Sequence, residues 1–136
     1  MTTNTNATNL FNMAIGFEEP RDFDSTSAFT EPYGIRVSGE FAQLEQRVDL
    51  LEFRLKSDIS SGQYNIEKPE VRSWIIVQAG LINTSYTPNT LKLTITIADH
   101  SNKHIVANYE INAEENHPEG SGTPITVKGD FDIYYK

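Results

Sequence analysis

The 136-residue chain contains no cysteine. This absence excludes disulfide scaffolds, zinc sites with thiolate ligands, dithiol redox chemistry and cysteine nucleophiles. No apolar run approaches the roughly 20 residues of a membrane span, so we expect no membrane insertion. The first six residues lack a basic segment followed by an apolar one, so no secretory signal peptide is predicted and we expect synthesis in the cytoplasm.

Positive charge is scarce. The chain has 11 Lys and Arg against 19 Asp and Glu, which gives a formal net charge of −8. Nucleic acids and anionic membranes are bound through clustered basic residues, so this balance argues against either as the main partner. The length suits one ordinary domain with a sizeable core.

Residues 1–39 are predicted to form an extended N-terminal arm. The first nine residues are mostly Thr and Asn, a composition that does not bury enough surface to order itself. Pro20 and Pro32 favour extended or turn structure in the residues before them. Large apolar side chains are nevertheless frequent, so two interpretations stay open: a frayed terminus, or an arm that docks on a partner protein. The arm's anchors would be Leu10, Phe11, Met13, Ile15, Phe17, Phe23, Phe29 and Tyr33.

Residues 40–62 predict an amphipathic helix over about 40–58. Ser38 is a suitable N-cap, and Ser61 and Gly62 would end the helix. Between them, apolar residues recur at spacings of 3 and 4, the pattern of a coiled-coil seam: Phe41, Leu44, Val48, Leu51 and Leu55. Two packings stay open. The helix lies on the protein's own sheet, or it forms a short parallel coiled coil in a homotrimer or homodimer.

Residues 63–136 predict an antiparallel β domain. Apolar and polar residues alternate over 91–97 and 105–111, which predicts a hairpin, and a last strand follows over 124–135. The stretch from Thr87 to Thr90 predicts a turn. Strands and helices do not alternate, so we expect a β-sandwich or barrel-like sheet. The predicted fold class is therefore mainly β with one helix, built from an arm, a helix and a β domain.

Candidate sites for chemistry are weak. His100 and His104, with Asp99, have a metal-binding residue composition, but they flank a hairpin loop and are not expected to converge. An acidic loop also lacks the ligand spacing of a calcium-binding loop: Glu114, Glu115, His117 and Glu119. We therefore predict no catalytic residue, no cofactor and no metal ion, and we expect that the protein is not an enzyme.

The β part carries aromatic residues that either pack in the core or stack on sugar rings: Trp74, Tyr86, Tyr109, Tyr134 and Tyr135. The order of arm, heptad helix and β domain is similar in outline to small oligomeric virion or phage-tail components. That resemblance implies a non-enzymatic structural subunit of a head, neck, tail, fibre or decoration, attached through its arm to protein partners and ending in a virion. The alternative is a β module that binds a carbohydrate or another surface ligand.

Overall fold

The computed structural model describes residues 9–41, 50–79, 82–116 and 124–136, and these residues form ten β-strands and no helix. All strand pairs are antiparallel. The strands are β1 (Leu10–Ile15), β2 (Arg21–Asp22), β3 (Ser25–Glu31), β4 (Gly34–Glu40), β5 (Leu50–Leu55), β6 (Gly62–Asn65), β7 (Val71–Ala79), β8 (Ile82–Asp99), β9 (His104–Asn116) and β10 (Pro124–Tyr134).

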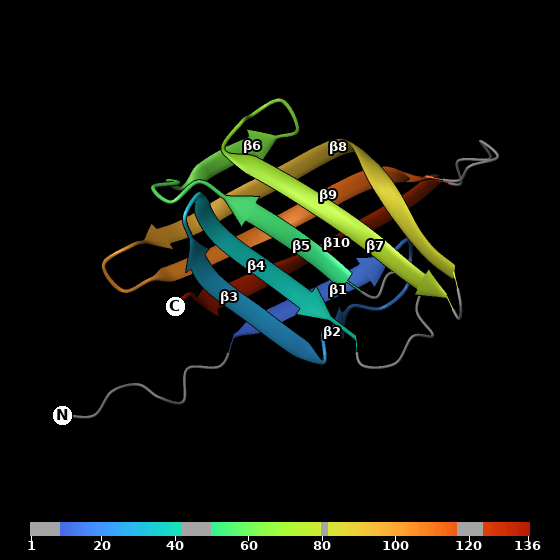
Figure 1. Cartoon of the computed structure of the whole chain (residues 1–136), viewed down its shortest axis with the longest axis horizontal. Coiled ribbons are helices and arrows are strands. Elements are labelled where there is room, and N and C mark those ends of the chain that lie inside the picture. Colours follow the sequence, from blue (N-terminus) through green and yellow to red (C-terminus); the bar gives the residue numbers. More distant parts are fainter. Residues whose placement is uncertain (1–8, 42–49, 80–81, 117–123) are drawn as a thin grey trace.

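The strands form two antiparallel layers in a β-sandwich-like arrangement (Figure 1). The hydrogen-bonded order is β2-β1-β10-β9-β8-β7-β5-β4-β3, and β6 pairs with β8. The long strand β8 joins the layers, because its first residues pair with β7 and the rest with β9. At the other side, the Thr30 amide donates to the Lys136 carbonyl (2.6 Å), and the Lys136 amide donates to the Ala28 carbonyl (3.0 Å). The edge strand β3 is therefore hydrogen-bonded to Lys136, which follows β10 in the chain, and this joins the two layers on this side.

The predicted arm is wrong as a description of the fold. The segment before residue 40 forms β1 to β4, and β1 pairs with β10 near the opposite end of the chain. Phe11 is 1% exposed, and its ring centroid lies 4.8 Å from that of Phe23 and 5.4 Å from that of Phe131. Successive side chains of a β-strand point to opposite faces of the sheet, and here the apolar side chains of the inward face complete the core between the layers.

The predicted helix over 40–58 is also wrong. Ser38 lies within β4, and β5 occupies the second half of the expected helix. Leu51, Phe53 and Leu55 are buried while Arg54 is exposed, so the segment follows the two-residue period of a strand. The side chains of the proposed seam share a core rather than a helical stripe, since Phe41, Leu51 and Leu55 are all buried. Leu44 and Val48 lie outside the described residues.

The predicted β character of residues 63–136 is confirmed. β8 and β9 form the expected hairpin, with Asp99 paired to His104 across the turn. The turn expected at Thr87–Thr90 is instead part of β8, where a register shift between Pro88 and Thr90 marks a β-bulge. The residue left unpaired is Asn89, and proline is tolerated beside a bulge because the regular ladder of hydrogen bonds is interrupted there. The described part of the chain contains no helix that could span a membrane.

Candidate functional site

Three arginines lie side by side on the outer face of the layer that contains β4, β5 and β7. Arg36 pairs with Arg54 in the β4–β5 register, and Arg54 pairs with Arg72 in the β5–β7 register. We call these three residues the arginine row. Like charges that face each other across strands destabilise a sheet, so the row requires compensating contacts or serves another purpose.

The first two arginines have such contacts. The Arg36 guanidinium carbon lies 4.4 Å from the centroid of the Phe29 ring, and Arg36 Nε lies 3.5 Å from Glu31 Oε1 and 3.8 Å from Glu52 Oε1. Arg54 Nε donates a hydrogen bond of 3.0 Å to Glu52 Oε2. Both glutamates are thereby occupied by the arginine row.

Arg72 differs from its two neighbours. Within the described residues, no hydrogen bond or ion pair engages its side chain. Glu70 lies two positions before it, but Glu70 Oε2 is buried and accepts no hydrogen bond from any described group. Arg72 is exposed and therefore presents a guanidinium with its donors available.

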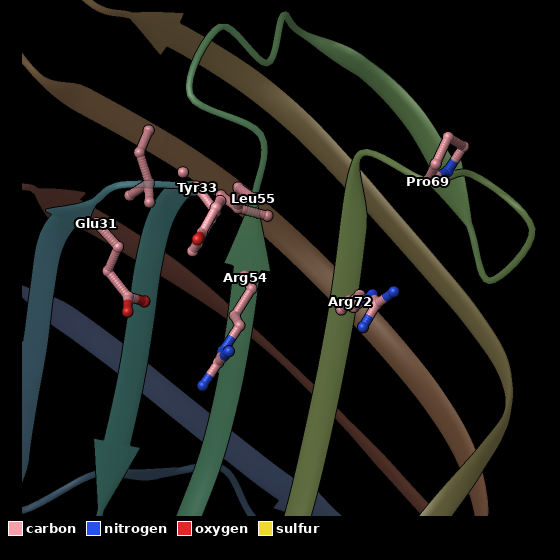
Figure 2. A pocket seen from close by; sticks show the side chains of 8 residues that line it. Glu31, Tyr33, Arg54, Leu55, Pro69 and Arg72 are labelled. Carbon is pink, nitrogen blue, oxygen red and sulfur yellow. The ribbon is translucent and has the colours of Figure 1, made fainter.

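A cavity of about 300 Å³ adjoins Arg54 and Arg72 (Figure 2). We call it the Tyr33 pocket, and it is lined by Glu31, Tyr33, Gly34, Ile35, Arg54, Leu55, Pro69 and Arg72. Ile35 and Leu55 are each 2% exposed and belong to the core, whereas Tyr33 is 96% exposed. The pocket thus combines an exposed aromatic ring with charged groups.

Gly34 explains how Tyr33 reaches this position. Its φ angle is +152°, and a Cβ at this residue would collide with the carbonyl oxygen of Leu55. Only glycine tolerates both the backbone conformation and this close approach. The turn between β3 and β4 can therefore sit against the end of β5, with Tyr33 beside the pocket.

A second hollow of about 390 Å³ lies on the outer face of β8, β9 and β10. Its central row is Lys92, Glu110 and Lys128, which are paired in register across the three strands. These charges alternate in sign, the favourable order for cross-strand neighbours. Unlike the arginine row, this row places opposite charges next to each other at both of its register pairs.

The weak metal candidate of the sequence does not assemble. His100 Nε2 donates to the Ile59 carbonyl (2.6 Å), which leaves Nδ1 to accept a hydrogen bond from the Tyr135 hydroxyl (2.8 Å). His104 Nε2 lies 2.7 Å from Asp132 Oδ1, and its ring stacks on Tyr134 with centroids 4.2 Å apart. With Ile59 and Tyr135 as partners, both ring nitrogens of His100 are occupied.

Asp99 is engaged by hydrogen bonds within its own turn. It accepts hydrogen bonds from the Asn102 side chain and backbone, which lower the pKa of its carboxyl group. The described part of the chain holds no group of three or more metal-ligating side chains. Of the acidic loop, Glu114 and Glu115 belong to β9, whereas His117 and Glu119 lie outside the described residues.

The proposed arm anchors occupy different environments. Phe11, Met13 and Phe23 are buried in the core, and Ile15 and Phe29 are partly buried. Leu10 is 53% exposed and Phe17 is fully exposed. Leu10, Phe17 and Tyr33 therefore present most of their surface to solvent.

The aromatic residues singled out in the sequence also fall into two groups. Tyr86, Tyr109 and Tyr135 are buried, and Tyr134 is partly exposed against His104. The side chain of Trp74 lies outside the described part of the structure. Sequence reasoning named Tyr33 only as an arm anchor and missed the arginine row, although the alternation of 51–55 contained a signal for the outward position of Arg54.

Comparison with known proteins adds no assignment: no protein-family model matches the chain, and neither curated proteins nor solved structures give a significant match. Function must therefore be argued from the site itself.

Proposed function

We propose that the protein is a non-enzymatic binding module that holds a saccharide in the Tyr33 pocket. The observation that carries the proposal is the combination of a ring that is 96% exposed with a cavity of about 300 Å³ beside it. A solvent-exposed aromatic ring offers an apolar face on which a sugar ring stacks. Hydrogen-bonding groups around the cavity then fix the orientation of the sugar hydroxyls.

The charged groups of the pocket support binding rather than turnover. Two of the three charged lining residues are arginines, Arg54 and Arg72, and a guanidinium group is a hydrogen-bond donor rather than a general base. Glu31 is the one carboxylate among the lining residues, and it already faces Arg36. Acid–base catalysis of glycoside cleavage requires a pair of carboxyl groups across the scissile bond.

Saturation-transfer NMR tests this proposal, because it detects weakly bound sugars through their own signals. We expect transfer from the wild-type protein to members of a panel of neutral and acidic oligosaccharides. Tyr33→Ala should abolish this transfer, whereas Tyr134→Ala, a matched change on the opposite layer, should preserve it. Absence of transfer to every sugar, or sensitivity to Tyr134 alone, would contradict the proposal.

A second candidate is a structural subunit of a larger assembly, as the order of sequence segments suggested. The observation that favours it is that two large apolar side chains are exposed on the outer face of the other layer, Leu10 at 53% and Ile97 at 43%. They stand at the two ends of a row in register across β1, β10, β9 and β8, with Asp132 and Val106 between them. Large exposed apolar surface is typical of protein interfaces.

Sedimentation velocity tests this second candidate. Wild-type protein at tens of micromolar should sediment as a dimer or trimer, and Leu10→Lys with Ile97→Lys should sediment as a folded monomer. A wild-type monomer would remove the homo-oligomer from the proposal.

A further inference from the structure

We propose that the Tyr33 pocket selects acidic saccharides, with Arg72 as the residue that binds the carboxylate of the sugar. This inference rests on the proposed function, since it names the class of sugar that the same pocket takes.

Arg72 has an available guanidinium group. Its two neighbours in the arginine row are engaged by Glu31 and Glu52, while no described group engages Arg72. A guanidinium offers two parallel N–H donors that match the two oxygens of a carboxylate. Arg72 is therefore the group of this pocket that is ready to receive an anion.

Arg72 also occupies an unfavourable position in the sheet. It stands directly opposite Arg54 in the β5–β7 register, an arrangement that destabilises neighbouring strands. A bound carboxylate would supply the negative charge that Arg72 lacks, since Glu52 already pairs with Arg54. Residues that lower stability without a structural return are often kept for binding.

The charge around the pocket differs in sign from that of the whole chain. Arg54, Arg72 and Glu31 give the lining of the pocket an excess of one positive charge, although the whole chain has a net charge of −8. In Figure 2, Glu31 lies on one side of β5 and Arg72 lies on the other. Arg72 therefore stands apart from the one lining carboxylate, which leaves room for an anion beside it.

The exposed ring of Tyr33 indicates that the anion is part of a sugar. This ring lines the same cavity as Arg72, so a ligand that stacks on the ring can also reach the guanidinium. A free phosphate or carboxylate ion would use Arg72 alone and gain nothing from the ring. A uronic acid carries both features, a pyranose face and a carboxylate.

The test compares galacturonic acid trimer with the matched neutral galactose trimer, by NMR titration of the protein. We expect the wild-type protein to bind the acidic trimer about 10- to 100-fold more tightly, the range of one charge-assisted contact. Raising the salt concentration from 0.05 to 0.5 M should weaken only the acidic trimer, because salt screens exposed charges.

Four variants sharpen the comparison. Arg72→Gln should bring the two trimers to equal affinity while leaving the protein as stable as wild type or more so, and Arg72→Lys should retain part of the preference. Glu31→Gln removes the lining carboxylate and should tighten the acidic trimer. Lys128→Gln makes the same charge change as Arg72→Gln on the opposite layer and should have no effect.

The outcomes separate the two proposals. Equal affinity of the wild-type protein for both trimers, with loss of both in Tyr33→Ala, would overturn the selection of acidic sugars and leave the saccharide-binding function intact. Binding of the acidic trimer that is lost in Lys128→Gln instead would place the site on the opposite layer and overturn both. Failure of both trimers to bind would overturn the proposed function and this inference with it.

Discussion

Replacement of Phe11 by alanine separates an integral strand from a docking arm. The Phe11 side chain is 1% exposed and packs its ring against those of Phe23, Phe131 and Tyr109, at centroid distances of 4.8, 5.4 and 6.0 Å. Truncation of a buried Phe to Ala costs about 3–5 kcal/mol of folding free energy. We expect Phe11→Ala to lose that amount, which is a large part of the stability of an ordinary domain.

Phe17 provides the matched control. It lies in the same predicted arm but is fully exposed in the turn after β1. An exposed substitution changes the free energy of unfolding by less than about 0.5 kcal/mol. Phe17→Ala should therefore be as stable as wild type.

Urea unfolding followed by far-ultraviolet circular dichroism measures both variants. With an m value of about 2 kcal/mol/M, the midpoint should fall by about 1.5–2.5 M for Phe11→Ala and by less than about 0.3 M for Phe17→Ala. Equal, small shifts for the two variants would refute the placement of β1 in the core and restore the free arm.

Three further variants test other parts of the structure. Leu51→Asp places a charge at a side chain that is fully buried in β5, so circular dichroism should show an unfolded chain, whereas a coiled-coil seam would give folded monomers. Gly34→Ala should lower the free energy of unfolding by at least about 1–3 kcal/mol in urea titrations, because its φ is +152° and the new Cβ meets the Leu55 carbonyl. Burial, and to a lesser extent the charge of Asp130, raise the pKa of the Tyr109 hydroxyl well above 10.0 in the folded protein. As the pH rises above 10.0, the unfolded chain therefore loses the Tyr109 proton first, and the free energy of unfolding falls. Tyr109→Phe should reduce this alkaline loss in pH-dependent urea titrations, and at neutral pH should cost about 1 kcal/mol for the lost hydrogen bond to the Asn12 carbonyl.

The strands of the second half of the chain were predictable because their alternation is uninterrupted. Leu91, Leu93 and Ile95 face the core, as the period of two required. The helix was wrong because Phe41, Leu51 and Leu55 fit a heptad by spacing although they belong to strand and strand-end positions. Alternation through Leu51, Phe53 and Leu55 was the competing pattern, and tertiary pairing with β4 and β7 decided in its favour.

The candidate site was less accessible to sequence reasoning. Arg36, Arg54 and Arg72 are each 18 positions apart and become neighbours only through the register of three strands. Cross-strand neighbours are set by pairing, which a single sequence does not specify. Tyr33 stood out as an apolar residue of the supposed arm, and its role depends on the turn that Gly34 permits.

The side-chain Nε–Hε resonance of Arg72 gives the most direct test of the binding site. It should be followed in nitrogen-15 spectra of the wild-type protein, assigned by its loss in Arg72→Gln, during titration with galacturonic acid trimer. We predict a saturable shift of this resonance together with the backbone amides of Tyr33 and Gly34. An unchanged Arg72 resonance at trimer concentrations that shift amides elsewhere in the protein would contradict the Tyr33 pocket as the site.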